Sequence, residues 1–195
     1  MSHMNRTTWR RRLVVSAAAL VATVALSSPA RGQEVISKEA AAALKTAFLA
    51  DLEVMRGKYV GLAEAFPPDK YSYKPMDGVR STAEVLMLVA MEGYAFIPNS
   101  FGGKPAALGT REEMAALRTL SDKPKVLEHL NKGFAHAKAQ LEAIDPATLT
   151  GSRQVMGRQM GALDAALAIG GDLHEHLGQL IAYARANRIV PPWSK

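Results

Sequence analysis

The sequence contains no cysteine and few aromatic residues, which make up 6% of its 195 positions. Without cysteine there is no disulfide, no thiolate-bound zinc and no thiol nucleophile from the protein itself. Any metal site must therefore be built from histidine, aspartate and glutamate side chains. The stability of the fold has to come from packing.

Apart from the N-terminus, the chain also has almost no excess of one charge. The chain has 24 Lys and Arg against 18 Asp and Glu, but residues 1–32 hold five arginines and no acid. Residues 33–195 therefore carry 19 basic and 18 acidic side chains. This part has neither a basic stripe interleaved with aromatics nor a glycine-rich phosphate motif, so the sequence predicts no nucleic-acid partner.

The N-terminus looks like a bacterial-type signal peptide behind a cloning remnant, Met1 to Met4. Four arginines precede an apolar run of 14 residues, 13–26, which is shorter than the roughly 20 that a membrane-spanning helix needs. The small residues Ala30 and Gly32 suit signal peptidase and predict cleavage after Gly32. A periplasmic or secreted protein without stable membrane insertion is expected. The alternative is an uncleaved leader that tethers a partner-binding bundle to the membrane.

Residues 33–195 are predicted to form a single all-α domain. Ala, Leu, Met, Glu and Lys dominate, β-branched residues are sparse, and no solenoid-type repeat is visible. Apolar residues at three- and four-residue spacings predict a four-helix bundle with an extra short helix. The long helices are expected at roughly 38–65, 82–98, 123–144 and 161–187, and the short one at roughly 111–118.

Capping and breaking residues set these limits. Ser81 with Glu84, and Thr110 with Glu113, have the spacing of a capping box. Pro98 is predicted to end the second helix, and the long connection that follows permits a crossover topology. Residues 146–160 are expected to be irregular, and the tail 189–193 to pack back on the bundle. The heptad-like spacing on the fourth helix comprises Leu163, Leu167, Gly170, His174, Leu177, Ile181 and Ala184.

The fourth helix also carries the residues most suited to chemistry. Asp172 and His176 are four apart, so they share one helix face and form a sound half-site for a divalent metal. His174 lies about 200° around the helix from His176, so the two cannot chelate one ion together. The alternative is that Asp172 only pairs with His176, or that both are solvated.

Two further groups could contribute. Glu92 shares a face with Val85 and Leu88, and a carboxylate on an apolar stripe must be paired or lie near the surface. It is a candidate third ligand, or a partner for Arg185 or a lysine. His129 and His136 lie on one face of the third helix, where satisfied boundary histidines are the simpler interpretation.

Two motifs give the chain a resemblance to the DinB-like (YfiT-type) superfamily of metalloenzymes. One is Tyr71-Ser-Tyr-Lys-Pro75 followed by the stretch from Gly78 to Leu86. The other runs from His174 through Gln179 and Tyr183-x-Arg185 to Val190-Pro-Pro192. The resemblance implies a four-helix bundle with a divalent metal near its middle, held by three histidines. It also implies that some members act as thiol-dependent transferases or hydrolases.

The family's ligand positions are only partly kept here. The helix-four histidine that precedes Leu-Gly-Gln corresponds to His176, and the histidine four residues earlier corresponds to Asp172. The helix-two histidine falls on Leu88, which cannot bind a metal, unless Glu92 one turn later replaces it. Further candidate pocket residues in these motifs are His174, Glu175, Gln179 and Arg185.

Two functions follow from this pattern. The first is an exported enzyme in which His176, Asp172 and Glu92 hold Zn²⁺, Ni²⁺ or Mn²⁺ and act on an unknown small molecule by hydrolysis or thiol transfer. The second is a non-catalytic periplasmic binding or structural bundle with a degenerate metal site. A homodimer is expected from the resemblance alone.

Overall fold

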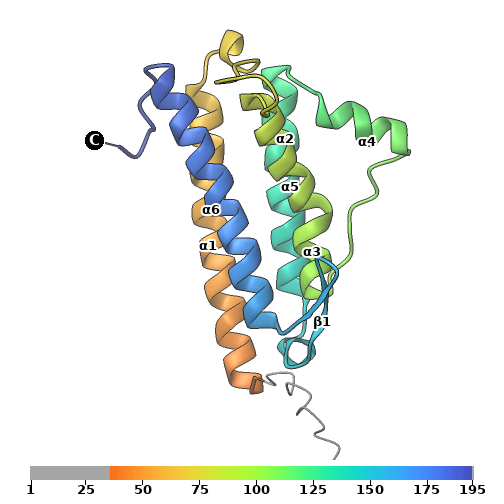
Figure 1. The fold of residues 1–195 in the computed structure, drawn as a ribbon. Coiled ribbons are helices and arrows are strands. Elements are labelled where there is room, and N and C mark those ends of the chain that lie inside the picture. Colours follow the sequence, from red (N-terminus) through yellow and green to blue (C-terminus); the bar gives the residue numbers. More distant parts are fainter. Residues whose placement is uncertain (1–35, 195) are drawn as a thin grey trace, which may run out of the picture. The chain divides into compact units, whose positions relative to one another are not determined.

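The structure, a computed structural model, describes residues 36–194, which form a bundle of helices (Figure 1). The predicted signal peptide and its cleavage point after Gly32 lie outside this range. Among the described residues, none of the helices combines the length and the apolarity that crossing a bilayer requires. The elements in chain order are α1 (Lys38–Ala65), η1 (Pro68–Lys70), α2 (Thr82–Met91), η2 (Glu92–Phe96), α3 (Ile97–Phe101), α4 (Arg111–Arg118), α5 (Lys123–Ala143), η3 (Pro146–Leu149), β1 (Arg153–Val155), β2 (Arg158–Met160) and α6 (Ala162–Ala186).

Four long helical segments form the bundle, and each packs against two neighbours. α1 packs against α5 and α6, and α2 packs against the same two helices. α1 and α6 run in one direction, whereas α2 to α3 and α5 run in the other (Figure 1). The chain returns from the end of α3 to the start of α5 through a long connection that carries α4. The predicted all-α four-helix bundle with an extra short helix and a crossover is therefore confirmed.

The helix ends are capped as the sequence predicts. Both capping boxes form, Ser81 with Glu84 at α2 and Thr110 with Glu113 at α4. Two lysines close helix C-termini elsewhere in the bundle: Lys123 donates to the Glu64 and Phe66 carbonyls after α1, and Lys45 does the same for the end of α5. A cation at a helix C-terminus satisfies free carbonyls and complements the helix dipole.

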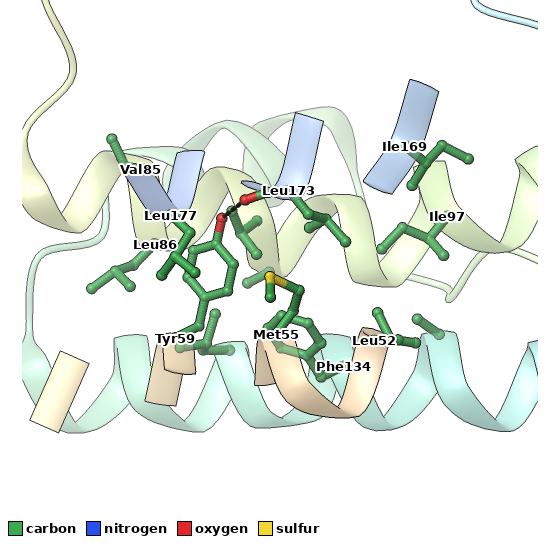
Figure 2. Packing of buried hydrophobic residues seen from close by; sticks show 14 of the residues in the cluster. Leu52, Met55, Tyr59, Val85, Leu86, Ile97, Phe134, Ile169, Leu173 and Leu177 are labelled. Carbon is green, nitrogen blue, oxygen red and sulfur yellow. Dashed lines mark hydrogen bonds between the residues drawn. The ribbon is translucent and has the colours of Figure 1, made fainter. Parts of the chain in front are cut away.

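The core is a continuous apolar layer between the helices (Figure 2). Leu52, Met55 and Tyr59 of α1 are almost fully buried and meet side chains from α2, α5 and α6. The Tyr59 hydroxyl donates a hydrogen bond to the Leu173 carbonyl of α6, which allows a polar atom to lie in this layer. The predicted return of the tail is confirmed, because Pro191 is buried and Lys58 of α1 lies over the Trp193 ring, 5.9 Å from its centroid.

One prediction for the second helical segment was wrong, because Pro98 does not end it. The chain passes through the π-helical turn η2 and continues to Phe101, with Pro98 in the first turn of α3. Proline cannot donate to the carbonyl four residues earlier, that of Tyr94. The amide of Ala106, in the following loop, donates to this carbonyl instead at 2.8 Å. A tertiary hydrogen bond thus replaces the one that proline removes.

The connection between α5 and α6 is more regular than expected. Instead of an irregular stretch, it contains η3 and an antiparallel hairpin in which Val155 pairs with Arg158. The two turn residues, Met156 and Gly157, have φ values of 52° and 73°. Two successive positive φ values give the tight turn that suits the twist of a hairpin. Methionine is rare at such a position, so the turn had no clear sequence signal.

The buried face of α6 also differs from the predicted one. Leu163 and Leu167 are 42% and 68% exposed, whereas Ala162, Ala165 and Ala166 are buried. The alanines form the buried face at the start of α6. The predicted face was wrong here because it was chosen by the spacing of the leucines. Beyond Ile169, the buried positions are Leu173, Leu177, Leu180, Tyr183 and Ala184.

Candidate metal centre

Three of the predicted residues lie together, partly buried, between the second helical segment and α6. Glu92 comes from η2, and Asp172 and His176 come from successive turns of α6. One ligand atom from each residue lies within 4.8 Å of the other two, a grouping that could hold a metal ion. The His176 Nε2 atom is 3.7 Å from Asp172 Oδ1 and 3.9 Å from Glu92 Oε1. These distances exceed a hydrogen bond, so the imidazole faces both carboxylates without bonding to either.

The position of Glu92 depends on how closely α5 approaches the second segment. A Cβ atom on Gly93 would lie 2.5 Å from the Gly133 backbone carbon, so only glycine fits there. The π-helical turn starts at Glu92, at this crossing, and such turns often occur at functional sites. Glu92 remains one turn beyond Leu88, because its amide still donates to the Leu88 carbonyl.

Burial governs the electrostatics of the group. The side chains of Glu92 and His176 are only 11% and 13% exposed, and that of Asp172 is 30% exposed. Burial raises the pKa of Glu92 to about 8, and the nearby negative charge of Asp172 acts in the same direction. The Arg80 guanidinium opposes this shift. The two carboxylates therefore stand close enough to repel each other unless a proton or a cation comes between them.

Two buried atoms in this group have no hydrogen-bond partner, Glu92 Oε2 and His176 Nδ1. An unpaired buried polar atom costs about 1–3 kcal/mol, so a native structure retains it only for a reason. Two carboxylates and one imidazole are a suitable donor set for a divalent metal. The residues present therefore fit a metal, although Leu88 occupies the family's helix-two ligand position.

The other predicted pocket residues do not join this group. His174 is half exposed and lies 3.3 Å from Asp51 on α1, as its angular offset from His176 requires. Glu175 and Arg185 are exposed, and within residues 36–194 Arg185 makes no ion pair, so it is not the partner of Glu92. His129 and His136 have simple partners, the Tyr94 hydroxyl at 3.2 Å and the Lys104 carbonyl at 2.9 Å.

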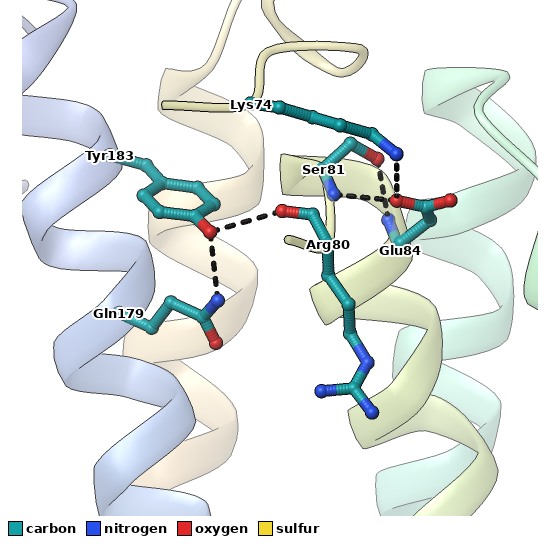
Figure 3. Close-up of polar contacts among 6 residues, drawn as sticks. All are labelled: Lys74, Arg80, Ser81, Glu84, Gln179 and Tyr183. Atoms are coloured by element: carbon teal, nitrogen blue, oxygen red, sulfur yellow. Dashed lines mark hydrogen bonds and ion pairs between the residues drawn. The ribbon is translucent and has the colours of Figure 1, made fainter. Parts of the chain in front are cut away.

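Gln179 belongs to a separate polar network that joins the start of α2 to the end of α6 (Figure 3). It donates to the Tyr183 hydroxyl, which in turn donates to the Arg80 carbonyl at 3.0 Å. Beside them, Glu84 accepts from the Ser81 amide and pairs with Lys74 at 3.0 Å. The two motifs that resemble the DinB-like family meet in this network, so several of their residues position helices rather than contact a metal.

Two further residues lie near the candidate metal group. Tyr59 lies on the core side, where burial, followed by the charges of Glu92 and Asp172, raises its pKa. The sequence pattern of the first helix already favours core packing for this tyrosine. Arg80 precedes the α2 capping box, and nothing in its local sequence pattern indicates that its charge acts on Glu92. Arg80 was missed because it comes from another element and approaches the group only in the folded chain.

A cavity opens directly beside Glu92. It has a volume of about 680 Å³ and lies between the second helical segment, the connection that follows α3, and α4. We call it the α4 cavity. Glu92, Leu88 and Met91 form part of its wall, and Met114 of α4 lines it as well. The candidate metal group therefore has an adjoining space of the size that small-molecule sites commonly have.

Comparison with known proteins agrees with the fold. No curated protein matches the chain closely enough to lend it a function. The sequence model of the DinB superfamily matches residues 51–180, a range that includes Glu92, Asp172 and His176. This match covers two thirds of the chain, and the protein belongs to the DinB superfamily.

Proposed function

We propose that the protein is an exported divalent-metal-dependent hydrolase or thiol transferase with an atypical metal site. The observation that carries this proposal is the convergence of Glu92, Asp172 and His176 with two of their buried atoms unpaired. Membership of a superfamily whose members often bind metals supports it. Two carboxylates and one histidine would replace the family's three histidines.

The roles of the residues follow from their positions. Nε2 of His176 and the carboxylates of Asp172 and Glu92 would hold Zn²⁺, Ni²⁺ or Mn²⁺. A bound divalent metal supplies Lewis-acid activation of water or of a thiol. Glu92 offers an oxygen on the side of the α4 cavity, where a substrate would lie. The Tyr59 side chain lies fully buried on the core side of these ligands.

Elemental analysis tests this proposal directly. The protein is purified without chelator and without a polyhistidine tag, and its metal content is compared with that of His176→Ala. The matched control is His174→Ala, which removes an exposed imidazole two residues away on the same helix. We expect near one equivalent of a transition metal in the wild type and the control, and none in His176→Ala. Thiol and ester substrates would then be assayed.

One observation favours a second function, a non-catalytic binding or structural bundle with a degenerate site. Leu88 stands where the family's helix-two histidine would stand, and it lines the α4 cavity without offering a ligand atom. In that case His176 would serve only as the charge partner of Asp172 and Glu92. No bound metal in the wild type, even after incubation with Zn²⁺, Ni²⁺ and Mn²⁺, would exclude the first function and leave the second.

Export is part of the proposal and has its own test. The short apolar run and the small residues at Ala30 and Gly32 support a cleaved leader. Mass spectrometry of the natively exported protein should give a mass that begins at Gln33. A mass that retains the leader would instead indicate a membrane-tethered bundle.

A further inference from the structure

The α4 cavity is lined by apolar side chains that lie outside the fully buried core. These side chains come from three separate segments. α4 has no buried residue at all and packs on α2 but on no other long helix to a comparable extent. Apolar groups held around an unfilled space are typical of a ligand site. The side chains concerned include Leu88, Met91, Phe96, Pro105, Leu108 and Met114.

Arg80 stands where this cavity meets a second, more polar one. The second cavity has a volume of about 580 Å³ and is lined by Lys74 and Gln179, among others. Arg80 and Glu84 line both cavities. The Arg80 side chain extends away from the α2–α6 network, which uses only its backbone carbonyl (Figure 3). A ligand in these two spaces would therefore need an apolar body and a polar end.

The charges around this junction are unequal. Within residues 36–194, Arg80 and Arg118 form no ion pair, and both line the α4 cavity. Glu84 is already neutralised by Lys74 at 3.0 Å and by the Ser81 amide. Glu92, the remaining acid in the wall, faces His176 and the proposed metal. Within residues 36–194 both guanidinium groups are therefore free of direct ion pairs, although the charge of Arg80 also acts on Glu92. A guanidinium binds an oxyanion in a two-pronged geometry.

We propose that the α4 cavity binds an amphipathic organic anion, with its apolar body against Leu88 and Met114 and its anionic group at Arg80. Arg118 adds a second positive charge from α4. This anion would be the substrate class of the proposed metal centre, and that part of the inference rests on the proposed function. The binding itself depends on the cavity and on Arg80 and not on the metal.

Calorimetric titration of the protein with octanoate tests the proposal. Octan-1-ol and octylammonium have the same chain without the negative charge, and all three probes are titrated into chelator-treated and Zn²⁺-loaded protein. We expect octanoate to bind one to one, and the two other probes at least about tenfold more weakly, as loss of a charge-assisted hydrogen bond predicts. Equal affinity for the three probes, or no binding of octanoate, would overturn the proposal.

Variants locate the site. Arg80→Gln should lower the affinity for octanoate by at least about tenfold, toward that of octan-1-ol. Arg111→Gln removes an exposed arginine of α4 that does not line the cavity, and should bind octanoate as the wild type does. Ala106→Phe, which keeps the amide that bonds to Tyr94, should fill the cavity and abolish binding. Melting curves confirm that each variant is folded. If Arg80→Gln binds octanoate like the wild type, the proposal is wrong.

The experiments distinguish failure of the ligand-site proposal from failure of the metal-centre proposal. Octanoate binding that persists in metal-free His176→Ala and still requires Arg80 supports the ligand site whatever the metal analysis gives. A stoichiometric metal together with no octanoate binding in either metal state overturns the ligand site alone. As a second measurement, hydrogen exchange of residues 102–119 should slow when octanoate binds, because the ligand supplies contacts that α4 lacks.

Discussion

Glu84 and Glu92 lie about two turns apart on the same helical segment, and their surroundings are opposite. The Ser81 amide, then Lys74, hold the pKa of Glu84 below its usual range. Burial beside Asp172 raises the pKa of Glu92 to about 8 and leaves one of its oxygens unpaired. The first glutamate stabilises the fold, whereas the second costs stability. A position that is kept at a cost is the better candidate for function.

The largest expected effect comes from disturbing the helix crossing that positions Glu92. In Gly93→Ala the new methyl group would lie 2.5 Å from the Gly133 backbone, and backbone cannot yield as a side chain can. We expect a loss of about 3 kcal/mol in the free energy of unfolding, together with loss of the bound metal. Denaturant unfolding and metal analysis measure both.

The control for this change is Gly57→Ala on α1, where the added methyl group meets no atom within 4 Å. Alanine in an open helix position should raise stability by about 0.5–1 kcal/mol. If Gly93→Ala behaves like Gly57→Ala, the close crossing does not fix the site.

The second effect is stabilisation by metal. Saturating Zn²⁺ at about 100 times its dissociation constant should add about 2.7 kcal/mol to the stability of the wild type, because only the folded chain brings the three ligands together. His176→Ala should show no such gain, and His174→Ala should keep it. Thermal melts with and without added metal provide the measurement. A gain that survives in His176→Ala would place the metal elsewhere.

The third effect concerns how stability depends on pH in chelator-treated protein. The contributions of Glu92 and Glu84 to the free energy of unfolding should change in opposite directions as the pH rises. The pKa of Glu92 is about 8 in the folded state, above its ordinary value of 4.5, so the folded state holds more protons in this interval. Its contribution to stability therefore falls as the pH rises from about 4.5 to about 8. Glu92→Gln should be more stable than the wild type by about 2 kcal/mol at pH 8.5, and equal to it near pH 4.

Glu84 should behave in the opposite way. Its pKa is lowered, so its contribution is present above its ordinary value and is lost as the pH falls through the lowered value. Glu84→Gln should therefore be less stable than the wild type at pH 7, with the difference shrinking in acid. Urea unfolding across the pH range compares the two variants, and parallel pH profiles would show that the contrast is false.

The smallest expected effect concerns the network between α2 and α6. Tyr183→Phe removes the donor to the Arg80 carbonyl and the acceptor for Gln179, and should cost about 1 kcal/mol. Metal content should not change, because these residues hold helices in place. A Tyr183→Phe protein that loses its metal would show that the network and the metal centre are one unit.

The sequence was sufficient for features that depend on local spacing. Capping boxes at Ser81 and Thr110, and the i, i+4 pair of Asp172 and His176, are set by neighbours within one turn. It was also sufficient to propose Glu92 as a third ligand, because a carboxylate on an apolar stripe needs a reason to be there.

Features that depend on contacts between distant segments were missed. The helix continues past Pro98 because an amide eight residues further along bonds to Tyr94, and the exposure of Leu163 and Leu167 follows from alanines at the α6 contact. Arg80 and Glu92 likewise line the same cavity only in the folded chain. No pattern within one helix contains this information.

The hydrogen bond from the Ala106 amide to the Tyr94 carbonyl has a mechanical consequence. This bond ties the connection that forms one wall of the α4 cavity to the π-helical turn that begins at Glu92. Moving that wall outward would leave the Tyr94 carbonyl without its partner, at a cost of about 1–3 kcal/mol. The position of this cavity wall is therefore coupled to the shape of the turn that carries a proposed metal ligand.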